Sequence, residues 1–143
     1  YQSNSLKEIC FDTYMQGLVE NMRQTYATDD ANIVLHVKSE PHFLNIEQAL
    51  SCGLLINECV TNAIKHAFDK KGGEIFIGFT CKEHHCLLEV RDTGKGLSET
   101  FSWASQTTLG MQLIEGIVRN QLQGELDYAV HHGTHFRFHF TKE

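Results

Sequence analysis

Two pairs of short apolar runs, each joined by a brief polar link, constrain the fold of this chain more than any other feature. The first pair covers 74–80 and 86–91, and its link is Lys82-Glu83-His84-His85. The second pair covers 126–130 and 136–140, which are separated by the turn His131-His132-Gly133. Links of this length suit β-hairpins, whose strands run antiparallel. We therefore predict a sheet that is largely antiparallel.

Three further regions show the spacing of amphipathic helices, in which apolar residues recur every three or four positions. The predicted helices cover Asp12–Ala27, with Asp12 as the N-cap, about Ile46–Phe68, and Leu109–Leu122, which Gly124 terminates. An alternating run over Asn32–Lys38 predicts one more strand, and the aperiodic stretch 92–108 predicts a loop. This order of elements predicts an α+β sandwich with helices on one face of the sheet.

Composition and charge exclude several classes of protein. A length of 143 residues predicts a single domain. Apolar residues make up 41% and there is one Pro, which excludes disordered and collagen-like chains. The net charge of −6 argues against a generic nucleic-acid binder, which would carry a basic face. No run approaches the roughly 20 apolar residues of a membrane helix.

The five cysteines include no C-x-x-C pair, so the sequence favours reduced thiols in a cytoplasmic protein over a disulfide framework or a zinc site. Cys52 and Cys59 lie within a predicted helix and are predicted to be small core residues. The histidine pairs at 84–85 and 131–132 fall in predicted turns, where exposed side chains are more typical than metal ligands.

The predicted helix 46–68 carries a polar face. At about 100° per residue, Glu58, Asn62, Lys65 and His66 share one arc, and apolar residues lie opposite. An amide oxygen is a hard ligand for Mg²⁺, and Lys is a point charge suited to phosphate oxygens. A solvated polar face explains the same pattern, since charged faces are usual on surface helices.

Three shorter motifs follow, each of which also has a purely structural interpretation. Asp92-Thr93-Gly94-Lys95-Gly96 comes directly after a strand, where a carboxylate can accept a hydrogen bond from an exocyclic amine, but it is also an ordinary turn. Thr107-Thr108-Leu109-Gly110 opens a helix, whose N–H groups favour anions, or Thr is simply an N-cap. Gly133-Thr134-His135-Phe136 is a turn that leads into a strand.

The joint order of these motifs is more specific than any one of them. Asn-Glu-x-x-x-Asn-Ala-x-Lys-His, Asp-x-Gly-x-Gly, Leu-Gly-x-x-Leu and Gly-Thr-x-Phe resemble the nucleotide-binding boxes of the GHKL ATPases. Within that superfamily the chain resembles the catalytic ATP-binding domain of sensor histidine kinases related to the HWE kinases. The resemblance implies a two-layer GHKL (Bergerat) fold over 1–143, in which 1–30 comprises a linker and the first helix on the side of the dimerisation domain.

The resemblance also implies roles for the residues around the phosphates. Asn62 would coordinate Mg²⁺, and Glu58 would position a water or act as the catalytic base. Lys65 and His66 would face the phosphates. The positions implied at the phosphate tail are Thr108, Leu109 and Gly110.

A second group of positions is implied around the adenine base. Asp92 would bind the adenine amino group, aided by Thr134 through a water molecule. Gly94, Gly96 and Leu97 would lie against the base.

The implied function is that of a protein histidine kinase catalytic domain. The chain would bind ATP and Mg²⁺ and donate the γ-phosphate to a histidine on a separate dimerisation domain, with a response regulator downstream. None of the nine histidines is placed like a phosphoacceptor, so we predict that the chain binds ATP but does not phosphorylate itself at a histidine. We expect a cytoplasmic domain that is monomeric alone and contacts neither nucleic acid nor membrane, whether or not its parent protein is membrane-attached.

Two alternatives stay open at this point. An anti-sigma-factor-type serine kinase shares the superfamily, the size and the boxes, and would phosphorylate a serine on a partner protein. A non-catalytic nucleotide-sensing or docking module would retain the boxes without phosphoryl transfer.

Overall fold

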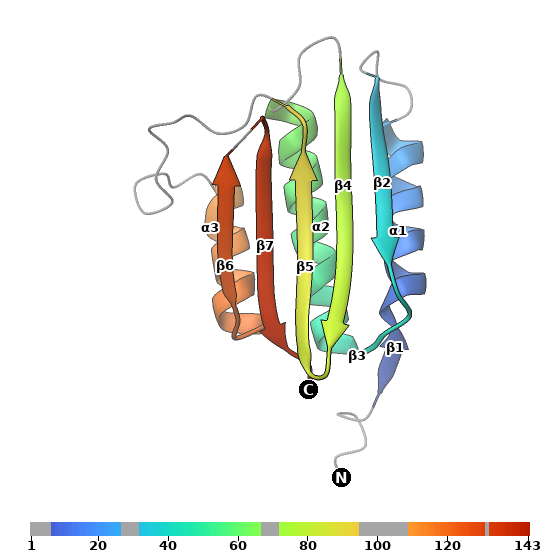
Figure 1. Ribbon diagram of the computed structural model, residues 1–143, viewed down its shortest axis with the longest axis vertical. Helices are drawn as coiled ribbons and strands as arrows, with labels where there is room; N and C mark the ends of the chain where they lie inside the picture. The colour runs from blue at the N-terminus through green and yellow to red at the C-terminus, as the bar shows by residue number, and fades with distance from the viewer. Residues whose placement is uncertain (1–6, 27–31, 67–71, 95–108, 131) are drawn as a thin grey trace.

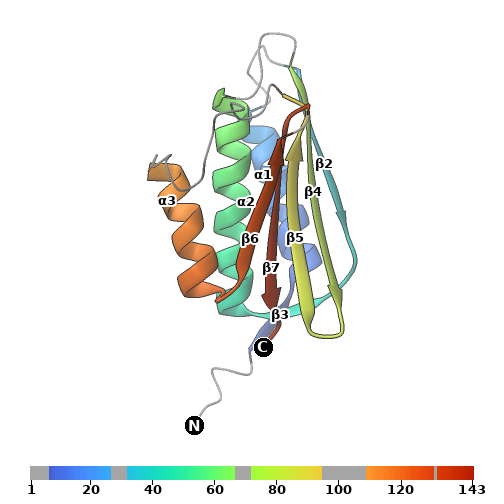
Figure 2. The same cartoon turned by 60° about the vertical axis from the view of Figure 1, so that its left-hand side comes forward.

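A five-stranded sheet forms one layer of the protein, and three helices cover one of its faces (Figures 1 and 2). The computed structural model describes residues 7–26, 32–66, 72–94, 109–130 and 132–143. The strands in spatial order are β2 (Ile33–Ser39), β4 (Gly73–Lys82), β5 (His85–Asp92), β7 (Thr134–Thr141) and β6 (Glu125–Val130). This architecture confirms the predicted α+β sandwich.

The pairing of the strands follows from the length of their connections. β4–β5, β5–β7 and β6–β7 are antiparallel, and the predicted hairpins 74–91 and 126–140 are present. The β4–β5 hairpin closes through Glu83 and His84, and Glu83 has a positive φ of 59°. β2 and β4 are parallel, because the chain between them contains a long helix that returns it to the same end of the sheet.

The helices agree with the predicted segments, with two corrections. They are α1 (Phe11–Tyr26), α2 (Ile46–His66) and α3 (Leu109–Gly116). Asp12 lies in the first turn of α1 and is not its N-cap; its carboxylate instead accepts a hydrogen bond from the Ser39 hydroxyl of β2. The last helix is α-helical only to Gly116 and continues as a π-helical turn, η2 (Ile117–Gln121).

The hydrophobic core lies between the sheet and the helices. Large side chains with less than 2% exposure come from every layer, and include Phe11, Met15, Leu55, Ile77, Phe79, Leu88, Ile114 and Phe138. The rings of Phe11 and Phe79 meet edge to face at 4.6 Å and join α1 to the sheet. Cys52 and Cys59 are buried in α2, as predicted. None of the described helices is long and apolar enough to cross a membrane.

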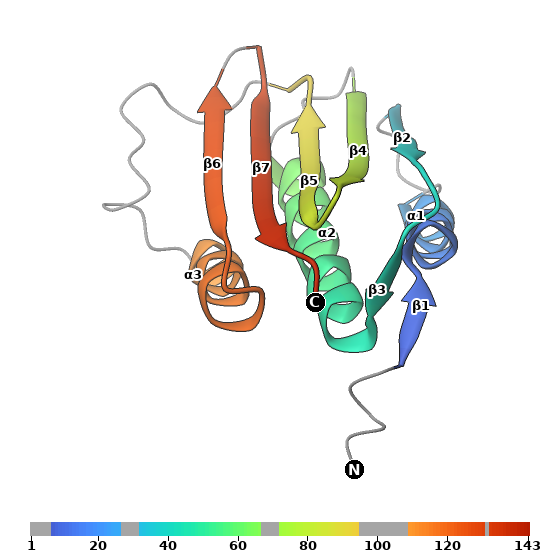
Figure 3. The same cartoon turned by 60° about the horizontal axis from the view of Figure 1, so that its bottom comes forward.

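A small second sheet lies at one end of the molecule and was not predicted. It pairs β1 (Glu8–Cys10) with β3 (Phe43–Asn45) in antiparallel register (Figure 3). Each strand has three residues, which is too short for an alternating pattern to be visible in the sequence. The backbone N–H of Phe11 donates to the carbonyl of His42 at 2.8 Å and continues the contact into α1.

Cys81 and Cys86 form a disulfide, so the prediction that all thiols are reduced was wrong. The two residues lie directly opposite each other in the β4–β5 register, with their Cα atoms 4.1 Å apart. The sequence did not indicate this bond, although the two cysteines are only five residues apart. The pairing becomes apparent only when the two-residue turn fixes the register of the hairpin.

We expect Cys81→Ala to lower the free energy of unfolding by about 2 kcal/mol under non-reducing conditions, because the bond closes a short loop in the unfolded chain. Urea unfolding of both proteins, with and without a dithiol reductant, measures this loss. The wild type and the variant should converge in the reductant. If the wild type and the variant had equal urea midpoints in both buffers, the bond would not stabilise the fold.

Candidate functional site

The polar face of α2 is oriented as the helical period predicts. Glu58 and Asn62 are half-buried, and Lys65 is exposed. Val60 and Ala63, on the opposite arc, are buried in the core. Because the apolar arc anchors the helix on the sheet, the polar arc is held at a fixed orientation towards the start of α3.

Gly110, in the first turn of α3, lies directly against two of these polar side chains. A Cβ atom added at Gly110 would lie 3.2 Å from Asn62 Nδ2 and 3.4 Å from Glu58 Oε1. Asn62 Oδ1 would be 3.5 Å from the same point. The absent side chain therefore leaves a small space that is bounded by a carboxylate and an amide, both of which carry hard oxygen atoms.

Asp92 ends β5 and is only 8% exposed. Its Oδ1 atom accepts a hydrogen bond from the backbone N–H of Gly94 at 2.9 Å and another from the backbone N–H of Thr134 at 3.3 Å. Both bonds go to one oxygen, so the carboxylate is held in a single orientation by β7 and by the segment that follows β5. Thr134 is itself buried.

Gly133 allows β7 to approach this carboxylate, and the sequence did not single out the reason. A Cβ atom at Gly133 would lie 1.9 Å from the backbone oxygen of Asp92, and the residue has a φ of +126°. Both facts require glycine, because an L side chain would clash and would be strained. The Gly-Thr pair thus fixes the distance between β7 and the end of β5.

Burial raises the pKa of the Asp92 carboxyl above its ordinary value, although the hydrogen bonds from Gly94 and Thr134 and the charge of Arg91 act in the opposite direction. Burial likewise raises the pKa of the Cys59 thiol, and the negative charges of Glu58 and Asp92 add to this effect.

The C-terminal end of α2, the end of β5 and the beginning of β7 lie at the same end of the molecule, at the top of Figure 1. The structure thus brings Gly110 against Glu58 and Asn62, and Thr134 against Asp92, from segments far apart in the sequence.

Several predicted positions fall on residues or side chains that the structure does not describe. Gly96, Leu97 and Thr108 lie outside the described residues, as do Lys95 and Thr107. Leu109 and His66 are the first residue of α3 and the last of α2, and nothing is described of their side chains.

The donor set suits a divalent cation bound together with an anionic ligand. Glu58 and Asn62 provide carboxylate and amide oxygens beside the space at Gly110, which a Cβ atom would fill. Mg²⁺ takes such ligands in small number and keeps waters or substrate phosphates for its remaining positions. The residues present therefore fit Mg²⁺ with a phosphate-containing ligand.

Comparison with known proteins shows the family to which the chain belongs. The model of the histidine kinase-, DNA gyrase B-, and HSP90-like ATPases matches residues 47–143. Sensor histidine kinase PdtaS of Mycolicibacterium smegmatis is 33% identical over 122 residues, which are 84% of this chain and 24% of that protein. An anti-sigma F factor of Bacillus licheniformis is 37% identical over 46 residues, 32% of each chain. The chain spans 17 to 26% of the length of the histidine kinases that it matches.

A solved structure shares the fold. The histidine kinase domain of the blue-light-activated histidine kinase EL346 from Erythrobacter litoralis superposes with a TM-score of 0.81 at 24% identity. The match covers 92% of this chain and 65% of that one.

We expect Asp92→Asn to be at least as stable as the wild type at pH 7, because the substitution removes a buried charge and retains the acceptor for Gly94 and Thr134. Because the folded pKa is raised, the wild type gains stability as the pH falls through that pKa towards the ordinary value of about 3.9. The advantage of the variant should therefore shrink over that range.

Urea unfolding of both proteins at several pH values between 7 and about 4 tests this expectation. A variant that is less stable than the wild type at pH 7, by a margin that narrows on acidification, would contradict the assignment of a buried charge.

Proposed function

Because the chain belongs to the histidine kinase-, DNA gyrase B- and HSP90-like ATPases, we propose that it binds Mg-ATP and donates the γ-phosphate to a histidine on a separate dimerisation domain. It would serve as the catalytic domain of a two-component sensor histidine kinase, with a response regulator downstream. The observation that carries this proposal is that the contact of Gly110 with Glu58 and Asn62 lies at the same end of the molecule as the buried, oriented carboxylate of Asp92.

Asp92 is the residue that we assign to the adenine amino group. Its Oδ1 atom is committed to two backbone N–H groups, so Oδ2 is the oxygen that would accept from a ligand. Partial exclusion of water strengthens such a hydrogen bond, since the effective dielectric constant is lower than in bulk water. Thr134 lies beside this carboxylate and would reach the base through water. Gly94, Gly96 and Leu97 are proposed to line the base.

The polar face of α2 is the part that we assign to the phosphates. Asn62 would hold Mg²⁺ through its amide oxygen, and Glu58 would position a water or act as the base. Lys65 is exposed and would supply a positive charge to the phosphates together with His66, while Thr108, Leu109 and Gly110 would meet the phosphate tail. The Mg²⁺ ion, when bound, neutralises phosphate charge. Catalysis of this kind depends mostly on position and charge stabilisation.

The positions of the described histidines support an acceptor on another domain. His36, His135 and His139 project from the strands, and each pairs with a carboxylate. His84 lies in the β4–β5 turn, and His42 packs against the Phe79 ring. No histidine whose side chain is described lies on a helix.

A serine acceptor is the second candidate, because an anti-sigma F factor matches 46 residues of the chain. The longer match to the sensor kinase, over 122 residues, favours histidine. The chemistry of the product separates the two: label from γ-labelled ATP is lost in acid from phosphohistidine and is retained by phosphoserine.

We expect a non-hydrolysable ATP analogue to bind saturably, with Mg²⁺ tightening the complex. Asp92→Asn should weaken binding by about tenfold or more, since Nδ2 would present a second donor to the adenine amine in place of an acceptor. Asn62→Ala should remove most of the Mg²⁺ dependence. Calorimetric titration of the three proteins, each with and without Mg²⁺, measures both effects. Absence of binding to the wild type would reject the ATP site and favour a docking module.

The space beside Gly110 gives a second, matched test. Gly110→Ala should reduce affinity for the Mg-bound analogue by about tenfold, because the new methyl group enters the space between Glu58 and Asn62. Gly116→Ala, in the same helix, is the control, because nothing lies within 4 Å of its added Cβ. Both changes raise helix propensity alike. Equal affinities for the two variants would exclude a phosphate or metal ligand at Gly110.

A further inference from the structure

The hydrogen-bond ladder between β4 and β5 ends at Thr93 with a side chain in place of a main-chain group. The two-residue turn makes Lys82 and His85 a hydrogen-bonded pair, and such pairs alternate along the ladder, so Glu74 and Thr93 form the next one beyond β5. The N–H of Thr93 donates to the Glu74 carbonyl at 3.0 Å, as in a regular pair. The N–H of Glu74 donates to the Thr93 hydroxyl oxygen, also at 3.0 Å, where a regular pair would use the Thr93 carbonyl.

This last bond of the ladder bears on the path of the chain after Asp92. The N–H of Gly94 turns back to Asp92 Oδ1 at 2.9 Å, two residues along the chain. Two residues of an extended strand rise about 6.6 Å, so a chain that continued along β4 would carry the Gly94 N–H away from the carboxylate. The ladder must therefore end at Thr93, and the hydroxyl then supplies the acceptor that the backbone N–H of Glu74 requires.

The part of β4 that receives Thr93 is itself fixed by side chains. The Glu74 carboxylate lies 2.7 Å from His36 Nε2 on β2. The His36 ring stacks on Phe76 with the ring centroids 4.6 Å apart, and the Arg91 guanidinium lies 4.1 Å from the Phe76 centroid. His36, Phe76 and Arg91 occupy one row of the register across β2, β4 and β5. Thr93 is thus bonded to a part of the sheet that is held by both neighbouring strands.

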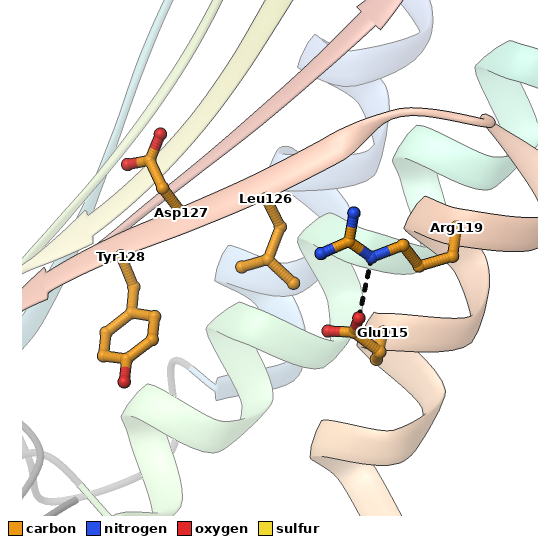
Figure 4. A pocket seen from close by; sticks show the side chains of 5 residues that line it. All are labelled: Glu115, Arg119, Leu126, Asp127 and Tyr128. Atoms are coloured by element: carbon orange, nitrogen blue, oxygen red, sulfur yellow. Dashed lines mark hydrogen bonds and ion pairs between the residues drawn. The ribbon is translucent and has the colours of Figure 1, made fainter. Parts of the chain in front are cut away.

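Asp127 shows that a carboxylate of the same sheet can be held in another way. It lies on β6 and borders a cavity in which Tyr128 is a neighbour (Figure 4). Its oxygens lie 2.6 Å from Arg137 Nε and 3.2 Å from His139 Nε2. Burial acts to raise the pKa of Asp127, but the hydrogen bonds and charges of these two partners hold it below its ordinary value. Side chains orient Asp127, whereas backbone donors orient Asp92, whose position therefore depends on the path of the chain.

We propose that Thr93 is a positioning residue of the nucleotide site, whose hydroxyl ends the β4–β5 ladder and thereby allows Gly94 to orient the Asp92 carboxylate. Thr93 acts through Asp92 and does not itself contact the base. Its role in binding rests on the proposed function, in which Asp92 accepts from the adenine amino group, but its effect on the carboxylate does not. Serine retains the hydroxyl, and valine retains the branched shape without it, so these two substitutions isolate the hydroxyl.

The first measurement needs no nucleotide. Nuclear magnetic resonance follows the exchange of the Gly94 amide and the titration of the Asp92 carboxyl in the wild type, Thr93→Val and Thr93→Ser. In Thr93→Val we expect the protection of the Gly94 amide to fall by about fivefold. The Asp92 midpoint should move to higher pH, because the hydrogen bond from Gly94 lowers the pKa of this carboxyl. Arg91, whose charge also lowers it, is present in every variant. Thr93→Ser should match the wild type.

Two controls locate the effect. The Asp127 midpoint should stay unchanged in Thr93→Val, because the partners of that carboxylate lie on β7. Thr80→Val makes the same change on an exposed residue near the other end of β4, and should leave both readouts as in the wild type. A Gly94 amide that stays protected in Thr93→Val would overturn the proposal. Equal effects of valine and serine at position 93, or of valine at positions 80 and 93, would also overturn it.

Calorimetric titration with the non-hydrolysable ATP analogue connects the turn to the ligand. Thr93→Val should weaken binding by about fivefold, and Thr93→Ser by less than about twofold. If the wild type binds no analogue, the proposed function fails, while the Gly94 and Asp92 readouts still decide whether Thr93 positions the carboxylate. Wild-type affinity in Thr93→Val, together with a loss of Gly94 protection, would overturn the role of Thr93 in nucleotide binding.

Discussion

The paired hydrogen bonds to Asp92 Oδ1 are the interaction on which the site depends. They connect the end of β5 to the beginning of β7, and they require that Gly133 carry no side chain. Burial of a carboxylate costs free energy, and two backbone donors offset only part of that cost. The part of the cost that is not offset raises the pKa of Asp92. A residue that is unfavourable for folding at neutral pH is expected where the chain must recognise a ligand.

α2 connects the candidate Mg²⁺ ligands to the core. One face of the helix is buried with residues such as Leu55 and Val60, and the other presents Glu58 and Asn62 to the start of α3. The same rigid element therefore sets both the packing of the sheet and the position of the candidate Mg²⁺ ligands. A substitution on the apolar face would displace the polar side chains with it, since packed interiors transmit small volume changes.

Periodicity predicted the larger elements because each has a buried face that is repeated over several turns or several strand residues. The hairpins, α1, α2 and the polar face formed by Glu58, Asn62 and Lys65 could be predicted for this reason. Pairings between distant or very short segments could not be predicted in this way. β1 and β3 have only three residues each, and the Cys81–Cys86 bond depends on the register of the hairpin. Likewise, the contact between Gly110 and Asn62 joins residues 48 positions apart, so spacing along the chain could not predict it.

β5 is fastened at both ends by different means. Near its start Cys86 is bonded covalently to Cys81 of β4, and at its end Asp92 is held by Gly94 and by β7. Between these points, the buried residues Leu88 and Val90 lie in the middle of the sheet. Fraying from either end is therefore opposed, and the central amides of β5 should exchange with solvent only when the whole domain opens. The carboxylate assigned to nucleotide recognition thus belongs to the most persistent cooperative unit of the fold.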